Sequence, residues 1–379
     1  MAVLDVIKSI SDLTLSKLDR NMASEDGMKI RIPKKSSRPK PRTYCFWNNK
    51  GGTGKTSLAF QAVCRIAEQN PDERFLVVDM CPQANLSEML LGGLTNHGSD
   101  NLLKLQGLLP RATIGGYFQL RLPSPYTPPT FNTDDFVVDP AKYNSSVPEN
   151  IDLVCGDPLL ELQVNAMSTL AMTQIPGTNT WLAVMDWLRD FLQPVQVRYS
   201  RIFFDANPSF SIYTQMALAA ADLLVLPVMA DDSSRRAVQN VFSLVYGLKV
   251  PSEIYTQHAF ATRLMGAQRP LPKVQVVVKN RLTQYMGPAS AYADVLSSIE
   301  DNVKNLHQSH RSMFAVPNSD GLFVDVRDFQ TTGVVAFAKG CPFSRLEAGR
   351  VTLLGMRIRV NESYRMLCLN AIDGLVERL

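Results

Sequence analysis

The chain has 379 residues, of which 45% are hydrophobic and 20% are charged, a composition typical of globular proteins with one large or two medium domains. It contains no run of about 18 apolar residues, so no transmembrane segment is expected, and Asp5 and Lys8 interrupt the first apolar stretch in a way that is not typical of a signal peptide. The six cysteines form no C-x-x-C pair, which argues against a zinc or redox site and favours a cytoplasmic protein with free thiols.

The net charge of +4 has its origin near the start of the chain. Apolar residues such as Leu4, Ile7 and Leu18 recur at helical spacing and predict an amphipathic helix within residues 1–24. A basic segment with no acidic residue follows: Lys29, Arg31, Lys34, Lys35, Arg38, Lys40 and Arg42. Removing these seven from the 39 basic residues leaves 32 against 35 acidic residues, a balance of −3. Residues 1–42 are therefore expected to precede the main domain, and their basic part is interpreted either as a solvated linker or as a flexible contact to a phosphate backbone.

From residue 43 to residue 379, strands and helices are expected to alternate in one domain. The predicted strands are 43–48, 75–80, 151–155, 201–205, 223–228, 274–280 and 313–316. The predicted helices are 55–69, 85–91, 157–168, 178–192, 211–220, 233–247, 289–307, 328–338 and 362–378. Because most of the strands are continuous apolar runs, they predict an α/β fold with a doubly wound, mostly parallel sheet and helices on both faces. Residues 94–150 are rich in Pro, Gly, Ser and Asn and are predicted to form an irregular insertion.

A glycine-rich loop follows the first predicted strand and precedes the first helix of the domain. Its sequence is Lys50-Gly51-Gly52-Thr53-Gly54-Lys55-Thr56, followed by Ser57. Strand, glycine-rich turn, Lys-Thr and helix is the layout of a P-loop, in which backbone N–H groups and the helix N-terminus bind phosphate. In this arrangement Lys55 reaches the β- and γ-phosphates and the Thr56 hydroxyl holds Mg²⁺. The motif predicts an ATP site, and Lys50, a second lysine at the front of the loop, is unusual for it.

Two further segments fall where a P-loop ATPase needs polar groups. Asp205 ends an apolar strand and precedes a Ser/Asn/Pro turn, so its carboxylate is a candidate for the Mg²⁺ shell, although a strand-end aspartate also serves as a turn former. Residues 77–85 also leave a strand, directly after the P-loop helix in sequence, and are predicted to lie beside the γ-phosphate. This second segment contains Asp79, Cys81 and Gln83.

The segments 49–56, 79–85, 205–209 and 278–281 together resemble those of ParA-type partition ATPases. That family belongs to a wider group with a deviant Walker A motif, which includes MinD-like proteins. Weaker similarity runs through residues 222–228 and 328–349, so the resemblance covers most of residues 43–379. It implies an ATPase that forms a homodimer around ATP, binds DNA without sequence preference, and is released by a centromere- or cargo-binding adaptor protein. It also implies a cytoplasmic, nucleoid-associated protein.

The resemblance assigns roles to individual residues. Lys50 matches the signature lysine, which in this family crosses the dimer to touch the phosphates bound by the other subunit. Lys55 and Thr56 match the lysine and the magnesium ligand of the same subunit, and Asp205 matches the Walker B aspartate. The segment that holds Asn280 and Arg281 matches a position near the adenine. Since two subunits then contact one ATP, dimerisation depends on the γ-phosphate, and hydrolysis becomes a release switch.

One position departs from the family's pattern of Asp-x-Asp-Pro-Gln, whose second aspartate orients or activates the attacking water. This chain has Cys81 there, and a neutral thiol with a reference pKa of about 8.5 is a poor substitute for a carboxylate. Two interpretations remain open. Either the chain binds ATP and hydrolyses it slowly, or Asp79 or Gln83 takes over the role.

Basic residues near the end of the chain form the predicted DNA contact. They are Lys339, Arg345, Arg350, Arg357 and Arg359, with Glu347 the one acidic residue between them. Two alternatives to DNA partition remain. A MinD-like membrane protein needs a basic amphipathic C-terminal helix, but acidic residues in 362–379 offset the basic ones. The second alternative is an ATP-dependent interaction module with impaired hydrolysis, which Cys81 suggests.

Overall fold

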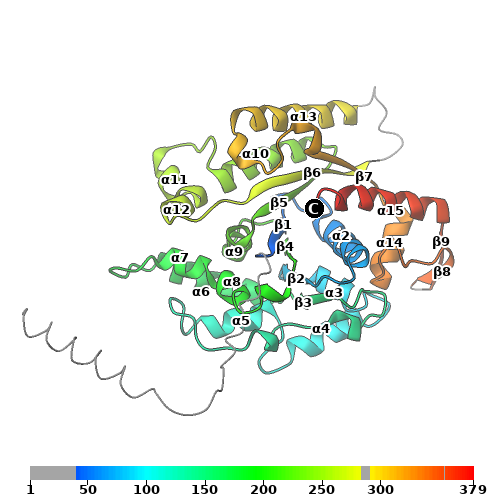
Figure 1. Ribbon diagram of the computed structural model, residues 1–379, viewed down its shortest axis with the longest axis horizontal. Helices are drawn as coiled ribbons and strands as arrows, with labels where there is room; N and C mark the ends of the chain where they lie inside the picture. Colours follow the sequence, from blue (N-terminus) through cyan, green and yellow to red (C-terminus); the bar gives the residue numbers. More distant parts are fainter. Residues whose placement is uncertain (1–39, 283–290, 354) are drawn as a thin grey trace, which may run out of the picture. The chain divides into compact units, whose positions relative to one another are not determined.

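Seven parallel strands form the central sheet of the computed structural model, which describes residues 40–282, 291–353 and 355–379 (Figure 1). The strands are β1 (Arg42–Phe46), β2 (Phe75–Met80), β3 (Ile151–Val154), β4 (Arg201–Ala206), β5 (Leu223–Val228), β6 (Lys273–Leu282) and β7 (Phe323–Arg327). Their order across the sheet is β3-β2-β4-β1-β5-β6-β7. The helix predicted within residues 1–24 and the basic segment up to Arg38 lie outside the described residues.

Each central strand contributes side chains to both faces of the sheet. In β2, Phe75 and Val77 join one buried apolar cluster, whereas Leu76 and Val78 join another. In β4, Phe203 and Phe204 divide in the same way. This alternation within continuous apolar runs is what a parallel sheet covered on both faces requires. The predicted α/β, doubly wound fold class is therefore confirmed.

Helices cover both faces (Figure 1). One cluster is completed by α2 (Lys55–Gln69), α3 (Asn85–Leu90), α4 (Gly98–Gln106), α14 (Gln330–Lys339) and α15 (Glu362–Val376). The other is completed by α5 (Ile114–Arg121), α6 (Leu159–Met172), α7 (Thr180–Met185), α8 (Trp187–Leu192), α9 (Ile212–Ala220), α10 (Asp232–Tyr246), α12 (Phe260–Gly266) and α13 (Ala291–Ser309). The short helix α11 (Glu253–His258) and the hairpin of β8 (Gly349–Leu353) and β9 (Met356–Val360) were not predicted.

Two predictions about the elements were wrong. Residues 313–316 do not form a strand: a 3₁₀ turn ends at Met313, and Phe314 makes one isolated bridge to Val274. Phe314 is buried, so its apolar neighbourhood reflects packing and not a place in the sheet, and the seventh strand is β7. The predicted irregular insertion at 94–150 contains the helices α4 and α5, and Thr113 caps α5 by accepting a hydrogen bond from Gly116 N at 3.0 Å.

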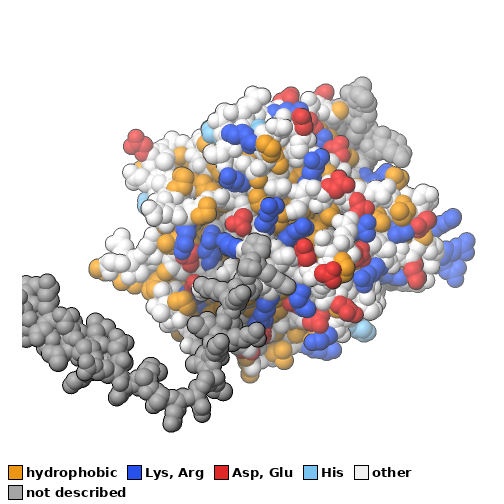
Figure 2. Space-filling model, in the orientation of Figure 1, with side chains coloured by type: hydrophobic (Ala, Val, Ile, Leu, Met, Phe, Trp, Pro, Cys, Tyr) orange, Lys and Arg blue, Asp and Glu red, His pale blue; other side chains and the backbone are white. Residues whose placement is uncertain are grey.

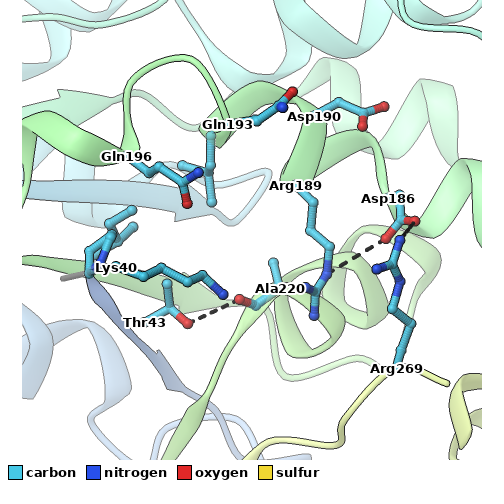
Figure 3. Close-up of a pocket in the computed structure, with 12 residues that line it drawn as sticks. Lys40, Thr43, Asp186, Arg189, Asp190, Gln193, Gln196, Ala220 and Arg269 are labelled. Carbon is cyan, nitrogen blue, oxygen red and sulfur yellow. Dashed lines mark hydrogen bonds and ion pairs between the residues drawn. The ribbon is translucent and has the colours of Figure 1, made fainter. Parts of the chain in front are cut away.

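The sheet edge at the amino ends of the strands holds a polar cavity of about 390 Å³ (Figure 3). Asp186, between α7 and α8, pairs there with Arg269 at 2.6 Å and with Arg189 at 3.6 Å. Thr43 at the start of β1 donates to the Ala220 carbonyl at 3.0 Å. These contacts join the helices of one face to the amino ends of the strands. The glycine-rich loop lies on the opposite side of the sheet, at the carboxyl ends of the strands.

Candidate nucleotide-binding site

The glycine-rich loop connects the carboxyl end of β1 to α2, as predicted. Gly52 and Gly54 have φ angles of +74° and +88°, a left-handed conformation that side chains disfavour. At Gly54 a Cβ atom would also lie 2.2 Å from Asn280 Nδ2, so only glycine fits. Gly51 and Gly52 are exposed, and a Cβ atom at either position would meet no other atom within 4 Å, so the outer side of the loop is open.

Two buried asparagines near the carboxyl ends of β1 and β6 hold the loop. Asn280, at the end of β6, donates to the Thr53 carbonyl at 2.8 Å. Asn48 donates to the Pro227 carbonyl of β5 at 2.6 Å and accepts from Lys50 N at 3.0 Å. The sequence interpretation placed Asn280 near the adenine but did not single out Asn48, whose signal was a polar residue between a buried strand and the glycines. The strand ends thus fix the conformation of the loop.

Lys55 turns back across the loop from the first residue of α2. Its ammonium donates to the Lys50 carbonyl at 3.0 Å, and the residue is buried. Burial lowers the pKa of Lys55, and the carboxylate of Asp205 acts in the opposite direction. A cation held against the loop backbone is placed to neutralise phosphate oxygens that bind to the N–H groups of a P-loop.

Asp205 is the last residue but one of β4, the strand next to β1, and is 2% exposed. Neither of its carboxylate oxygens accepts a hydrogen bond of ordinary geometry. Burial, and then the charge of Asp79, raise the pKa of Asp205 to about 8, while the nearby Thr56 hydroxyl and Lys55 act to lower it. A buried carboxylate without a partner is costly, and a divalent cation beside Thr56 would relieve that cost.

Two further buried oxygens of the site lack partners, Thr53 Oγ1 and Asn280 Oδ1. Among the described residues no group of three or more His, Cys, Asp or Glu side chains is placed to hold a metal. Mg²⁺ characteristically binds one or two protein ligands together with phosphate oxygens and water. The donor set of Asp205 and Thr56 therefore fits Mg²⁺ that arrives with a nucleotide.

Asp79 and Cys81 lie at the end of β2, the other neighbour of β4. Asp79 is fully buried and accepts hydrogen bonds from Ser87 N at 2.9 Å, Ser87 Oγ at 2.7 Å and Cys81 N at 3.0 Å. Burial raises the pKa of Asp79 to about 6, and these hydrogen bonds oppose the rise. Both oxygens of Asp79 are thus engaged in holding the turn that leads into α3.

Cys81 is half-buried and lies beside Asn207, whose Nδ2 is 3.7 Å from the sulfur. Burial, followed by the charges of Asp79 and Asp205, raises the pKa of Cys81 to about 12. The thiol is therefore neutral at physiological pH and cannot accept a proton as a carboxylate does. Gln83, the other residue considered for this role, is exposed.

Lys50 points away from the loop, toward the start of α10. Its ammonium pairs with Asp231 and donates to Ser234 Oγ at 3.3 Å. Burial acts to raise the pKa of Asp231, but the hydrogen bonds from Lys50 and from Ser234 N outweigh it and bring the pKa to about 2. Asp231 and Ser234 were not predicted from the sequence, because they lie more than 180 residues from Lys50.

The remaining predicted ligands differ in exposure. Ser57 and Thr56 are half-buried in the first turn of α2. Arg281 is exposed and has a φ angle of +60°, directly after Asn280. The structure therefore brings the loop, Thr56, Asp205, Cys81 and Asn280 together at one edge of the sheet.

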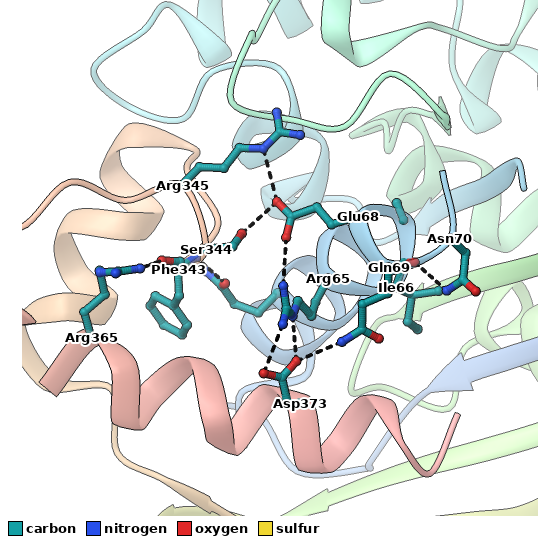
Figure 4. Close-up of polar contacts among 12 residues, drawn as sticks. Arg65, Ile66, Glu68, Gln69, Asn70, Phe343, Ser344, Arg345, Arg365 and Asp373 are labelled. Carbon is teal, nitrogen blue, oxygen red and sulfur yellow. Dashed lines mark hydrogen bonds and ion pairs between the residues drawn. The ribbon is translucent and has the colours of Figure 1, made fainter. Parts of the chain in front are cut away.

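The five basic residues predicted to contact DNA differ in their surroundings and exposure. Arg345 pairs with Glu68 of α2 at 3.1 Å (Figure 4). It also donates to the Ser145 carbonyl at 3.3 Å. Lys339 is half-buried at the end of α14. Arg350, Arg357 and Arg359 are exposed on the β8–β9 hairpin, where blue side chains gather at the right-hand edge of Figure 2.

The parallel sheet, the glycine loop and the unpartnered Asp205 define the class of P-loop nucleotide-binding proteins. The sequence profile of the AAA_31 family, described as an AAA domain, matches residues 41–253, which is more than half of the chain. The chain belongs to this family, and it is similar to ParA-type partition proteins.

Two curated relatives come from Myxococcus xanthus. The chain is 27% identical over 219 residues to the cell division protein PomZ, covering 58% of this chain and 56% of PomZ. It is 29% identical over 190 residues to the chromosome partitioning protein ParA, covering 50% and 53%. The matches thus span about half the length of these relatives.

Among solved structures, the fold is similar to the ATP complex of a Cyanothece McdA variant, with a TM-score of 0.56, 14% identity and coverage of 90% of this chain and 97% of that one. It is also similar to a putative plasmid partition protein from Borrelia burgdorferi bound to AMPPNP, with a TM-score of 0.50, 13% identity and coverage of 90% and 100%. At these identities the likeness concerns the fold.

Proposed function

We propose that this protein binds and hydrolyses ATP to position or segregate DNA or another cargo. The observation that carries the proposal is the buried Asp205 carboxylate, whose two oxygens lack partners beside Thr56 and the phosphate loop. A merely structural aspartate at a strand end would use those oxygens in a turn, as Asp79 does. Family membership supplies the second support.

The residues of the site divide the work of binding. Loop N–H groups from Gly51 to Lys55 bind phosphate oxygens, and the Lys55 ammonium neutralises their charge. Thr56 and Asp205 hold Mg²⁺, which supplies charge neutralisation at the phosphates when bound. Asp79 keeps the turn before α3 in place, so that Cys81 and Asn207 face the same space.

Hydrolysis by this chain is proposed to be slow. The attacking water needs a group that orients it by accepting a hydrogen bond. Cys81 has a neutral thiol, whose sulfur is a weak hydrogen-bond acceptor. Both carboxylate oxygens of Asp79 accept hydrogen bonds from Ser87 and the Cys81 amide. Asp79 therefore does not take over the role of the water-orienting aspartate that Cys81 replaces. If turnover is absent altogether, the chain is an ATP-dependent interaction module.

The nucleotide proposal is tested by titrating the chain with ATP in a calorimeter, with Mg²⁺ and with a chelator. We expect binding that weakens at least tenfold without Mg²⁺ and in the Lys55→Ala variant. Lys104, an exposed lysine on α4, provides the matched control as Lys104→Ala. Equal affinity in all three proteins would show that the loop is not the site.

DNA binding is proposed to use the β8–β9 hairpin. Arg350 and Arg359 lie directly opposite each other in the antiparallel register, and Arg357 lies opposite Thr352 on the same face. None of these three arginines has an acidic partner among the described residues. Like charges opposite each other are destabilising, unless an anion such as a phosphate backbone lies between them.

We also propose an adaptor protein and nucleoid association, which the resemblance to ParA-type partition ATPases implies. The MinD-like alternative has less support, because α15 buries Cys368, Ile372 and Leu375 against the domain. An apolar face that is already packed on α2 and β7 is not free for a membrane surface. No helix within the described residues is long and apolar enough to cross a membrane.

A further inference from the structure

A cavity of about 540 Å³ opens between α7, α10, α11 and α12, and none of the residues that line it belongs to the nucleotide site. Figure 1 shows α11 and α12 beside α10. Four aromatic side chains line the cavity, Trp181, Phe210, Tyr255 and Phe260. Phe260 stands edge-on to both Trp181 and Phe210, at centroid distances of 6.2 and 5.7 Å. A cavity of this size and lining is large enough for a bulky apolar side chain.

The charged residues that line this cavity all have one sign. They are Lys249 and Arg263, with His258 as a third basic side chain, and no aspartate or glutamate lines it. Glu253 begins α11 nearby but does not line the cavity. The cavity therefore favours a ligand that carries negative charge next to an apolar group.

Arg263 is the central cation of this cavity. Its guanidinium lies 4.6 Å from the centroid of the Trp181 ring, and its Nη1 lies 3.8 Å from Met172 Sδ. Among the described residues no carboxylate pairs with it, and burial lowers its pKa. A partly desolvated arginine that stacks on an aromatic ring and has no carboxylate partner can form an ion pair with an acidic group of a ligand.

Apolar surface continues beyond the cavity mouth. Helix α11 has no buried residue, and its Ile254 and Tyr255 are 69% and 62% exposed. Met172 and Met265 are also more than half exposed. Exposed apolar side chains gathered around a cavity, in contrast to single ones, mark an interaction site. Methionines add an adaptable surface to it.

We propose that this cavity docks a segment of a partner protein in which a bulky apolar anchor is flanked by acidic residues. The anchor fills the space among Trp181, Phe210 and Phe260, and the acidic flank contacts Arg263 and Lys249. Tyr, Trp and Arg, the residue types that dominate binding energy at protein interfaces, all line the site. The apolar surface outside the cavity favours a polypeptide over a small molecule. The proposal goes beyond ATP-driven positioning and uses none of its residues.

The test pans a random dodecapeptide phage library against the full-length chain, with counter-selection on the Tyr255→Ala/Lys249→Gln variant. Both altered residues are exposed, so the variant is expected to keep its fold. We expect selected peptides to share an aromatic or leucine anchor beside Asp or Glu. One such peptide, synthesised and labelled, should bind about tenfold more weakly to the Arg263→Gln variant and equally to Lys104→Gln.

The proposal is overturned by a failure to enrich any peptide, by peptides without acidic residues, or by equal binding to the Arg263→Gln variant. Calorimetry with ATP on the same variants separates this result from the nucleotide site. An unchanged ATP affinity alongside lost peptide binding supports the docking site, and a lost ATP affinity in the Lys55→Ala variant alone concerns only the proposed function.

Discussion

Asp205 combines full burial with a carboxylate that has no partner of ordinary geometry. Its pKa of about 8 means that the folded, nucleotide-free chain binds a proton there that the unfolded chain, with a carboxyl pKa of about 3.9, releases. Because the native state binds more protons between these two values, stability falls as pH rises from about 4 to about 8. Above that window the ionised, unpartnered carboxylate remains a destabilising charge.

The Asp205→Asn variant removes that charge and keeps the shape of the side chain. In the absence of nucleotide we expect its thermal midpoint at pH 8 to exceed that of the wild type by about 2–4 °C, and the gap to narrow toward pH 5. Differential scanning fluorimetry at both pH values measures this. Added Mg-ATP should stabilise the wild type and not the variant.

Asp79→Asn is the matched control, since Asp79 is equally buried and accepts hydrogen bonds from Ser87 and the Cys81 amide. Loss of the carboxylate there leaves donors facing an amide, so this variant should be less stable at every pH. Stabilisation of both variants would contradict the distinction between a ligand-binding and a turn-forming aspartate.

Cys81 is expected to limit the rate of ATP hydrolysis. The Cys81→Asp variant restores a group that orients water, and it should raise the ATP hydrolysis rate severalfold at saturating ATP. Steady-state phosphate release measures the rate, and Cys81→Ser, which is small and neutral, should leave it near the wild-type value. An unchanged or lower rate in the aspartate variant would rule out Cys81 as the cause of slow turnover.

At the scale of elements, burial decided what could be predicted from the sequence. Strands β2 and β5 were predicted to the residue, because continuous apolar runs are buried on both faces. Strand β7 was missed because it is an edge strand in which the residues other than Val326 are half-buried or exposed. Phe314, in contrast, is buried without belonging to a strand. Helix α11 was missed because none of its residues is buried, so its sequence has no apolar period.

The candidate site was predictable where it is local in sequence. The loop from Lys50 to Thr56 carries its own signal, since glycines, lysine and threonine follow one another. The contacts of Lys50 with Asp231, and of Asn280 with the Thr53 carbonyl, join residues 181 and 227 positions apart. Such contacts arise where the carboxyl ends of several strands meet at one side of the sheet, and the predicted strands did not specify the order of those strands.

The hairpin gives a prediction about DNA. The double variant Arg357→Gln/Arg359→Gln should weaken binding to random-sequence duplex DNA in the presence of ATP, and should reduce the slope of log affinity against log salt by about 1 per arginine. Fluorescence anisotropy at several salt concentrations measures both. Arg345→Gln is the control, because Arg345 is engaged with Glu68 and Ser145. An equal loss in the control would assign the effect to stability and not to DNA contact.

At the scale of the whole molecule, Lys50 connects the nucleotide site to assembly. Within one chain its ammonium is held by Asp231 and Ser234. In the ATP-bound homodimer that the resemblance to ParA-type ATPases implies, the same ammonium contacts phosphates bound by the partner, so these two states of Lys50 exclude each other. With a pKa of about 2, Asp231 stays ionised at any working pH, and acid does not release the lysine.

Variants of this pair should therefore move dimerisation in opposite directions. Lys50→Ala should abolish ATP-dependent dimers in analytical ultracentrifugation while ATP affinity of the monomer changes little, since Lys55 remains. Asp231→Asn removes the competing partner, so its ATP-bound dimer should dissociate at a lower protein concentration than that of the wild type. Weaker dimers in the Asp231→Asn variant would contradict this prediction. They would mean that Asp231 holds Lys50 in the orientation that the partner's phosphates require, so that the ion pair supports dimerisation and does not compete with it.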